Sequence, residues 1–291
     1  MNKIMDEKDL NKKYLISLTN FYKFGPVRIK KIKNYFPNFK SAWNAGLNEL
    51  HQSGIEENIV KEFISWRKNI QPDNLFEQLC HENINVVTVD DDNYPELLKE
   101  IYDPPVLIYY RGELKSHDPY ALAVVGSRKY TNYGQQVVEK ITSELAKNNI
   151  SIISGLALGI DSLAHLNTLT ANGRTVAVLG TGIDKKSIYP GSNRYLAEKI
   201  IANGGMICSE FPLGTPPLKH HFPQRNRIIS GLALGTLVVE AGEKSGALIT
   251  ANFSLDQNRE VFAVPGSVFS ASSAGPNNLI KQGARAISSS A

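Results

Sequence analysis

The sequence has few of the features that mark membrane, secreted or metal-binding proteins. Its 291 residues contain no apolar run near the roughly 20 residues of a membrane span, and the N-terminus lacks the apolar core of a signal peptide. Only two cysteines are present, Cys80 and Cys208, far apart and each within an apolar-rich stretch. We therefore expect a cytoplasmic protein with two buried free thiols and no disulfide. Without a CxxC or HExxH pair, a bound metal has no support either.

The signatures of nucleotide-dependent enzymes are also missing. No predicted strand is followed by GxGxxG, and the second ends in Ser154 where an acid would hold a ribose. The run from Gly180 to Ser187 resembles a P-loop, but Lys185 stands where its second glycine should be. There is no GxSxG elbow. These absences disfavour a dinucleotide cofactor, ATP hydrolysis and serine-hydrolase chemistry, and we expect no cofactor.

Positive charge, in contrast, is concentrated at one end of the chain. The formal net charge is +4, and residues 1–80 carry 13 Lys and Arg against 9 Asp and Glu, while the remainder is balanced. Between Phe21 and Lys40 there are six cations, six aromatic residues and no acid. This concentration indicates an accessory basic face on the N-terminal segment.

Residues 1–80 are predicted to form a small all-helical domain, because apolar residues recur there at helical spacing. Gly25-Pro26 separates two helical runs, and the following Arg28-Ile29-Lys30-Lys31-Ile32 resembles the second helix of a helix-hairpin-helix element. Two interpretations stay open for this region. It is either a helical adaptor with a solvated lysine face or a direct DNA contact.

From residue 84 the pattern changes to short, wholly apolar strands that alternate with amphipathic helices. Two β-branched and aromatic runs, Val86–Val89 and Val106–Tyr110, are predicted as edge strands joined to the main sheet. The pattern of the remaining strands predicts an α/β fold with a doubly wound, mostly parallel sheet covered on both faces. Those strands are Leu122–Val125, Ser151–Ile153, Thr175–Leu179, Gly205–Ser209, Leu237–Glu240 and Glu260–Val264.

Ligands of such sheets bind beyond the carboxyl ends of the strands, and the residues there favour an anion. Glycine-rich turns let backbone amides approach a phosphate, and Arg128 follows the first strand. The basic segment Pro217–Ile229 has three cations, two histidines, an aromatic ring and no carboxylate, and we expect an amphipathic run to begin near Asn226. An unpaired strand would offer phosphates to the cations and a base face to the ring. The predicted phosphate contacts are Arg128, Lys219, Arg225 and Arg227, with Phe222 as the stacking ring.

Catalytic pairs can also be drawn from the sequence. Asp161 and His165 are four residues apart on one predicted helix face and could form a base and its orienting partner. A helix-start Asp beside a satisfied His explains them better. Glu240 and Glu243 could act together in glycoside-type chemistry, although the sequence does not fix the loop that carries Glu243.

Taken together, the motifs resemble the DNA-processing protein A family, also called DprA or Smf. The matching segments follow the family's order over roughly residues 85–287, and together they are highly specific. They are Tyr94–Leu98, Asp103–Pro105, Val125–Arg128, Ile153–Asp161, Gly180–Gly182, Tyr189–Pro190, Ser209–Glu210, Phe222–Leu232, Ser245–Ala251 and Val264–Ser267.

The resemblance implies an extended Rossmann domain over residues 84–287, preceded by a helical domain of sterile-alpha-motif type. It implies a non-catalytic protein that binds single-stranded DNA, protects incoming strands and loads the RecA recombinase during natural transformation. A homodimer through the C-terminal part of the Rossmann domain, here Val268–Ala284, is implied as well. No C-terminal winged helix is expected. By similarity, the DNA-binding residues are Gly126, Ser127, Arg128, Ser154, Gly155, Lys219, Phe222, Arg225 and Arg227.

Two alternatives stay open. The first is a nucleotide- or phosphoribose-cleaving hydrolase of the related lysine-decarboxylase-like Rossmann group, whose Pro-Gly-Gly-x-Gly-Thr turn is absent from residues 240–246. The second is an interaction scaffold whose glycines serve only the turns.

Overall fold

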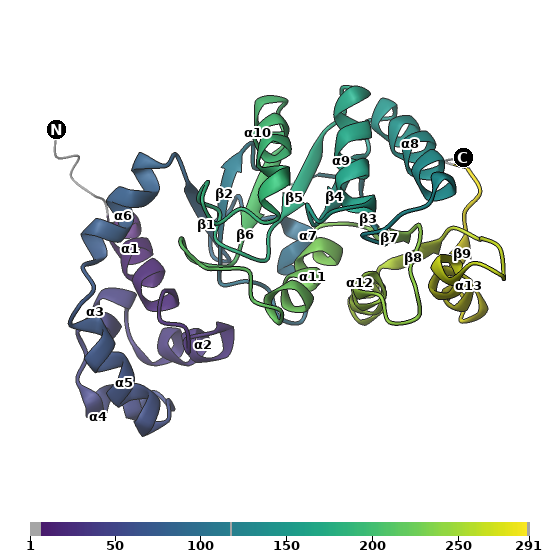
Figure 1. Ribbon diagram of the computed structural model, residues 1–291. Helices are drawn as coiled ribbons and strands as arrows, with labels where there is room; N and C mark the ends of the chain where they lie inside the picture. The colour runs from purple at the N-terminus through teal and green to yellow at the C-terminus, as the bar shows by residue number, and fades with distance from the viewer. Residues whose placement is uncertain (1–6, 117, 290–291) are drawn as a thin grey trace. The chain divides into compact units, whose positions relative to one another are not determined.

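The chain forms two compact units. The computed structural model describes residues 7–116 and 118–289. The first unit takes in the described residues up to Thr88 together with Pro105–Leu107, and the second takes in Val89–Pro104 and the described residues from Ile108 onward. Figure 1 labels the helices and strands of both.

The first unit is helical up to residue 81, as the spacing of apolar residues predicts. Its core is aromatic: the rings of Phe21, Phe24 and Phe63 lie within 4.7 to 5.4 Å of one another, centroid to centroid. Pro26 opens the second helix after Gly25, a position where its missing N–H costs no hydrogen bond. The elements are α1 (Glu7–Thr19), α2 (Pro26–Tyr35), α3 (Phe39–Asn44), α4 (Leu47–Gln52), α5 (Glu57–Arg67), α6 (Pro72–His81) and the strand β1 (Asn85–Thr88).

The cations of this unit are partly neutralised by carboxylates from later in the chain. Lys23 lies 2.5 Å from Glu62, and Arg28 lies 2.9 Å from Glu56. The Arg28 guanidinium holds the pKa of Glu56 down at about 2. The basic face inferred from residues 21–40 therefore has a weaker field than its sequence suggests, because the neutralising acids come from another segment.

One cysteine prediction is wrong. Cys208 is buried in a central strand, and burial raises the pKa of its thiol to about 12. Cys80, however, is exposed on α6. Its neighbour Leu79 points into the core, and one residue further along a helix turns the side chain about 100° away from that face.

A mostly parallel sheet forms the centre of the second unit. Its strands follow the order β2-β6-β5-β4-β3-β7-β8-β9, in which β2 runs antiparallel to β6 and the remaining neighbours are parallel. Val125, Val238 and Ala263 are aligned across three neighbouring strands, so those strands end at one edge. The bounds are β2 (Leu107–Gly112), β3 (Ala121–Val125), β4 (Ser151–Ser154), β5 (Thr175–Val178), β6 (Met206–Ser209), β7 (Gly235–Val238), β8 (Glu260–Ala263) and β9 (Arg285–Ala286).

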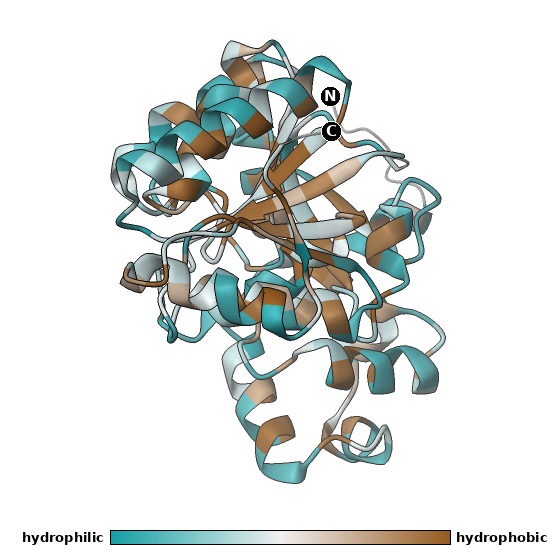
Figure 2. Ribbon diagram, turned by 90° about the vertical axis from the view of Figure 1, so that its right-hand side faces the viewer, coloured by the Kyte–Doolittle hydropathy of each residue, from teal (hydrophilic) through white to brown (hydrophobic). Residues whose placement is uncertain are grey.

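Helices cover both faces of this sheet, which confirms the doubly wound prediction. In Figure 1, α8, α9 and α10 lie on one face, and α7, α11 and α12 lie on the other. Figure 2 shows the apolar strands enclosed between these two layers. In the part of the chain that the structure describes, no helix is long and apolar enough to cross a membrane. The helices are α7 (Glu96–Lys99), α8 (Asn132–Lys147), α9 (Ile160–Thr170), α10 (Arg194–Ala202), α11 (His221–Gly231), α12 (Gly246–Asp256) and α13 (Ala274–Lys281), with short turns η1 (Gly191–Asn193) and η2 (Ala271–Ser273).

Among the boundaries that differ from those predicted, two matter for the site. Helix α11 begins at His221 instead of near Asn226, so Phe222 and Arg225 are helical residues and not part of a loop. Pro223 is compatible with this start, because the N–H groups of a helix's first turn have no partner within the helix. Strand β7 ends at Val238, which leaves Glu240 beyond the strand.

Candidate nucleic-acid interface

A cavity of about 620 Å³ lies at the carboxyl edge of the sheet. We call it the carboxyl-edge cavity. Its wall combines exposed cations with one aromatic pair and the first turns of α11 and α12. The lining residues are Val125, Gly126, Arg128, Ala157, Asp161, Tyr189, Pro217, Lys219, Phe222, Pro223, Arg225, Asn226, Ile229, Ser245, Gly246, Ala247, Ile249 and Thr250.

Arg128 stands on a loop that is anchored at both ends by Glu240. The backbone N–H of Ser127 donates to the Glu240 carbonyl at 2.6 Å. The Glu240 carboxylate accepts from the N–H of Thr131 at 2.9 Å and from its hydroxyl at 2.6 Å. Between these anchors the Arg128 side chain is exposed. Its guanidinium carbon lies 5.9 Å from the centre of the Phe222 ring.

Lys219 and Phe222 line the cavity from the segment that leads into α11 and from its first turn. Lys219 is exposed on the loop before α11, and Phe222 is half-buried on the first turn of that helix. The Phe222 ring lies 5.8 Å from the ring of Tyr189. Among the described residues, neither Arg128 nor Lys219 pairs with a carboxylate, so both charges are available to an anion beside an aromatic face.

Arg225 is buried, and its guanidinium donates hydrogen bonds within the protein. Its Nη1 donates to the carbonyl of Gly155 at 2.8 Å and to that of Val178. Asp161 accepts from the Gly155 N–H at 3.1 Å. Burial lowers the pKa of Arg225 to about 10, and it raises that of Asp161 against the opposing charge of Arg225. This buried pair shapes the loop after β4.

The small residues predicted for the site fall into two groups. Gly126 lines the cavity, and a Cβ on Gly155 would come within 2.7 Å of Arg225 and Asp161, so only glycine fits there. Ser154 is different: its buried hydroxyl donates to the Val124 carbonyl at 2.7 Å, toward the neighbouring strand. Ser127 turns its hydroxyl back to the Lys129 carbonyl at 2.7 Å.

Arg227 is placed apart from the cavity lining. Its side chain is buried and pairs with Glu210 at 2.6 Å and with Asp103 at 3.4 Å. Helical geometry explains the difference from Arg225, since residues two apart on a helix point to different faces. The structure therefore gives Arg227 an internal ion pair where the sequence predicts a phosphate contact.

The candidate catalytic pairs are not assembled. His165 is fully buried and its Nδ1 lies 2.7 Å from the Thr175 hydroxyl, and burial lowers its pKa to about 3. Asp161 binds the Gly155 backbone instead. Glu240 is 2% exposed and its carboxylate accepts a hydrogen bond from Thr131, while Glu243 is exposed. No group of His, Cys, Asp or Glu in the described ranges could hold a metal ion.

Tyr189, Asn226 and the first turn of α12 are cavity residues that sequence reasoning did not assign. Position gave a usable signal for Ser245 and Gly246, because they follow the strand β7 as Gly126 follows β3. Tyr189 follows β5 at a distance of eleven residues, so its position gave no signal. Tyr189–Pro190 is one of the segments that match the family, but only the folded chain brings the ring to Phe222.

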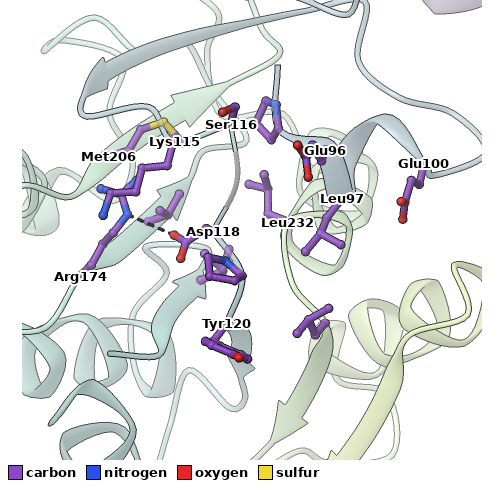
Figure 3. A pocket seen from close by; sticks show the side chains of 15 residues that line it. Glu96, Leu97, Glu100, Lys115, Ser116, Asp118, Tyr120, Arg174, Met206 and Leu232 are labelled. Atoms are coloured by element: carbon purple, nitrogen blue, oxygen red, sulfur yellow. Dashed lines mark hydrogen bonds and ion pairs between the residues drawn. The ribbon is translucent and has the colours of Figure 1, made fainter. Parts of the chain in front are cut away.

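A second pocket, of about 300 Å³, lies near the amino ends of the strands and has a different character (Figure 3). Its floor is apolar, with Leu97, Met206 and Leu232. Its one arginine, Arg174, is held by Asp118 at 3.2 Å, as Figure 3 shows. Its other cation, Lys115, shares the lining with the carboxylates of Glu96 and Glu100, so this pocket is a poorer anion site than the carboxyl-edge cavity.

Comparison with known proteins identifies the family. The model of the DNA recombination-mediator protein A family matches residues 85–291, which is most of the chain. The chain belongs to this family. Among curated relatives, the Smf protein of Synechocystis is 42% identical over 90% of this chain and 67% of its own length, and the DNA processing protein DprA of Streptococcus pneumoniae is 46% identical over 68% and 69%. The chain thus spans about two thirds of the length of these relatives.

Solved structures agree with the family assignment. DNA processing protein A of Streptococcus pneumoniae superposes with a TM-score of 0.81 at 36% identity, covering 96% of this chain and 95% of that one. DNA processing protein A of Helicobacter pylori, described for its unique single-stranded DNA binding mode, gives 0.64 at 30% identity, covering 72% and 92%. The fold expected from the resemblance to the DNA-processing protein A family, a Rossmann-like sheet preceded by a helical region, is confirmed.

Proposed function

We propose that this DNA recombination-mediator protein A family member binds single-stranded DNA in the carboxyl-edge cavity. The observation that carries this proposal is that Arg128 and Lys219, both exposed and without an ion pair in the described residues, line one cavity together with the Phe222 ring. An unpaired strand presents the two complementary features, backbone phosphates and an open base face. The single-strand binding of the Helicobacter pylori relative supports the same assignment.

In this proposal the residues act in different ways. Arg128 and Lys219 contact phosphates, Phe222 stacks on a base, and Gly126 lets the backbone approach the strand closely. Arg225 and Gly155 act indirectly by shaping the loop after β4. The protein then protects the strand and delivers it to the RecA recombinase in natural transformation, as a non-catalytic homodimer. The description of its family as recombination mediators supports the RecA step.

The test is fluorescence anisotropy with a labelled single strand and its duplex over a salt titration. We expect preference for the single strand. Arg128→Ala and Lys219→Ala should each weaken binding and lower the salt slope by about 0.7, the value for one phosphate contact on single strands. Lys140→Ala, which removes an exposed charge from the middle of α8, is the matched control and should change neither.

Equal affinity for the duplex, or indifference to both substitutions in protein whose unfolding curve is unchanged, would refute the site. The RecA step has its own readout. We expect the protein to shorten the lag before RecA hydrolyses ATP on a strand coated with single-strand binding protein. An unchanged lag would remove RecA delivery from the proposal and leave DNA binding intact.

A further inference from the structure

A segment beside the carboxyl-edge cavity has exposed cations that the cavity itself does not use. It runs from Lys185 to Arg194 and connects β5 to α10. Because helices of a doubly wound sheet begin at the edge where the strands end, η1 and the first turn of α10 lie at the same edge as the cavity. Tyr189, in the middle of this segment, lines the cavity and lies beside Phe222.

The segment is held in place on both sides. Asn193 donates from its side-chain amide to the Leu156 carbonyl at 2.8 Å, which ties it to the loop before α9. Asp184 accepts from the Gly214 N–H at 2.8 Å, which ties it to the loop that leads to Lys219. Within the segment, the Arg194 guanidinium donates to the Lys186 carbonyl at 2.6 Å. Its cations are therefore carried by an ordered backbone.

The charges of this segment are not compensated. Lys185 and Lys186 are exposed, and over the described ranges no carboxylate pairs with either one. Asp184, the acid adjacent to them, is buried and accepts hydrogen bonds from Ser187. In the first unit, by contrast, Lys23 and Arg28 are both ion-paired. Uncompensated cations thus gather next to the cavity.

We propose that Lys185, Lys186, Tyr189 and Arg194 form a track that continues the cavity and binds the next nucleotides of the same strand. This inference rests on the proposed single-strand binding. It adds that the bound strand continues from the cavity along the segment Lys185–Arg194. The base held at Phe222 is followed by a base at Tyr189, and the phosphates beyond it meet the ammonium groups of Lys185 and Lys186. The ligand is an unpaired polynucleotide longer than the cavity alone can hold.

The experiment compares a short oligothymidylate of about 4 nucleotides with one of about 12, the range that single-strand modules cover. The double variant Lys185→Ala/Lys186→Ala should bind the short strand as the unchanged protein does. For the longer strand its salt slope should fall by about 1.4. Extrapolated from a 1 M reference, that slope corresponds to a loss of roughly tenfold in affinity at ~0.15 M salt.

The control is Lys140→Ala/Lys147→Ala, which removes two positive charges from α8. Lys140 lies in the middle of that helix, and Lys147 is its last residue. An equal loss in this control, an equal loss for both strand lengths, or no loss for the longer strand would each overturn the track. Failure of the proposed function has another signature: Arg128→Ala would then leave binding of the short strand unchanged.

Discussion

At the scale of single residues, identical charges have opposite roles according to what surrounds them. Arg128 keeps its guanidinium in solvent over an aromatic ring, whereas Arg227 pairs inside the protein with Glu210. Removing Arg227 would leave the buried Glu210 carboxylate without its partner, which typically costs about 3–5 kcal/mol of stability. A loss of DNA binding in an Arg227 variant would therefore report unfolding, and Arg128 and Lys219 are the informative positions.

His165 gives a pH prediction at this scale. Its ring is fully buried, so its pKa falls from an ordinary value near 6.5 to about 3. The unfolded chain consequently binds a proton before the folded one as the pH falls. Stability from the neutral ring is complete above about pH 6.5 and decreases toward pH 3, by about 1.4 kcal/mol per pH unit between these values.

Urea unfolding at several pH values measures this slope. His165→Asn can keep a hydrogen-bonding partner for the Thr175 hydroxyl and cannot titrate. We expect the variant to be less stable at neutral pH but to lose less stability on acidification. Parallel pH profiles for the two proteins would show that folding does not lower the pKa of His165.

At the scale of elements, the strands were predicted better than the helix starts and side-chain contacts that follow them. Short buried runs such as Ser151–Ile153 could be placed to within one residue, because burial on both faces leaves a strong pattern. The start of α11 was placed five residues late, since the polar residues of its first turn conceal the helical period. The internal ion pairs of Arg227 could not be predicted for a related reason. Its partners Glu210 and Asp103 are distant in sequence, and only tertiary structure brings them together.

The junction of β7, α8 and η2 yields a prediction about positioning. The carboxylate of Glu240 holds Thr131, and it also accepts from the Ser272 hydroxyl at 3.2 Å. Glu240→Gln removes the negative charge and replaces one accepting oxygen by a donor, so the Thr131 hydroxyl has to change from donor to acceptor and both bonds lose their charge assistance. We expect the loop that carries Arg128 to loosen and single-strand affinity to fall several-fold.

A double-mutant cycle separates this effect from general destabilisation. If Glu240 acts through Arg128, then Glu240→Gln should have little further effect on DNA affinity in an Arg128→Ala background. Additive losses would mean that Glu240 supports the cavity by another route. Urea unfolding of each variant shows that the affinities refer to folded protein.

At the scale of the whole molecule, two exposed apolar side chains on the described surface bear on the proposed homodimer. Val268 and Phe269 follow β8 and are 83% and 96% exposed. They lie in the region Val268–Ala284 that the family resemblance implies for dimer formation. Large apolar side chains at such exposure are typical of surfaces that another molecule covers. We expect two protomers to meet here and to bring two cavities onto one strand.

Val268→Asp/Phe269→Asp tests this expectation, because a dimer would have to bury two new charges in each protomer. Light scattering should show a monomer for this variant, whereas we expect a dimer for the unchanged protein. Affinity for a strand of about 4 nucleotides should stay the same, since each cavity is intact. Affinity for a strand of about 30 nucleotides, which is long enough for two footprints, should fall at least tenfold as the second binding event ceases to be intramolecular.

A monomeric variant that keeps full affinity for the long strand would show that one protomer suffices. A variant that remains dimeric would show that the interface does not include Phe269.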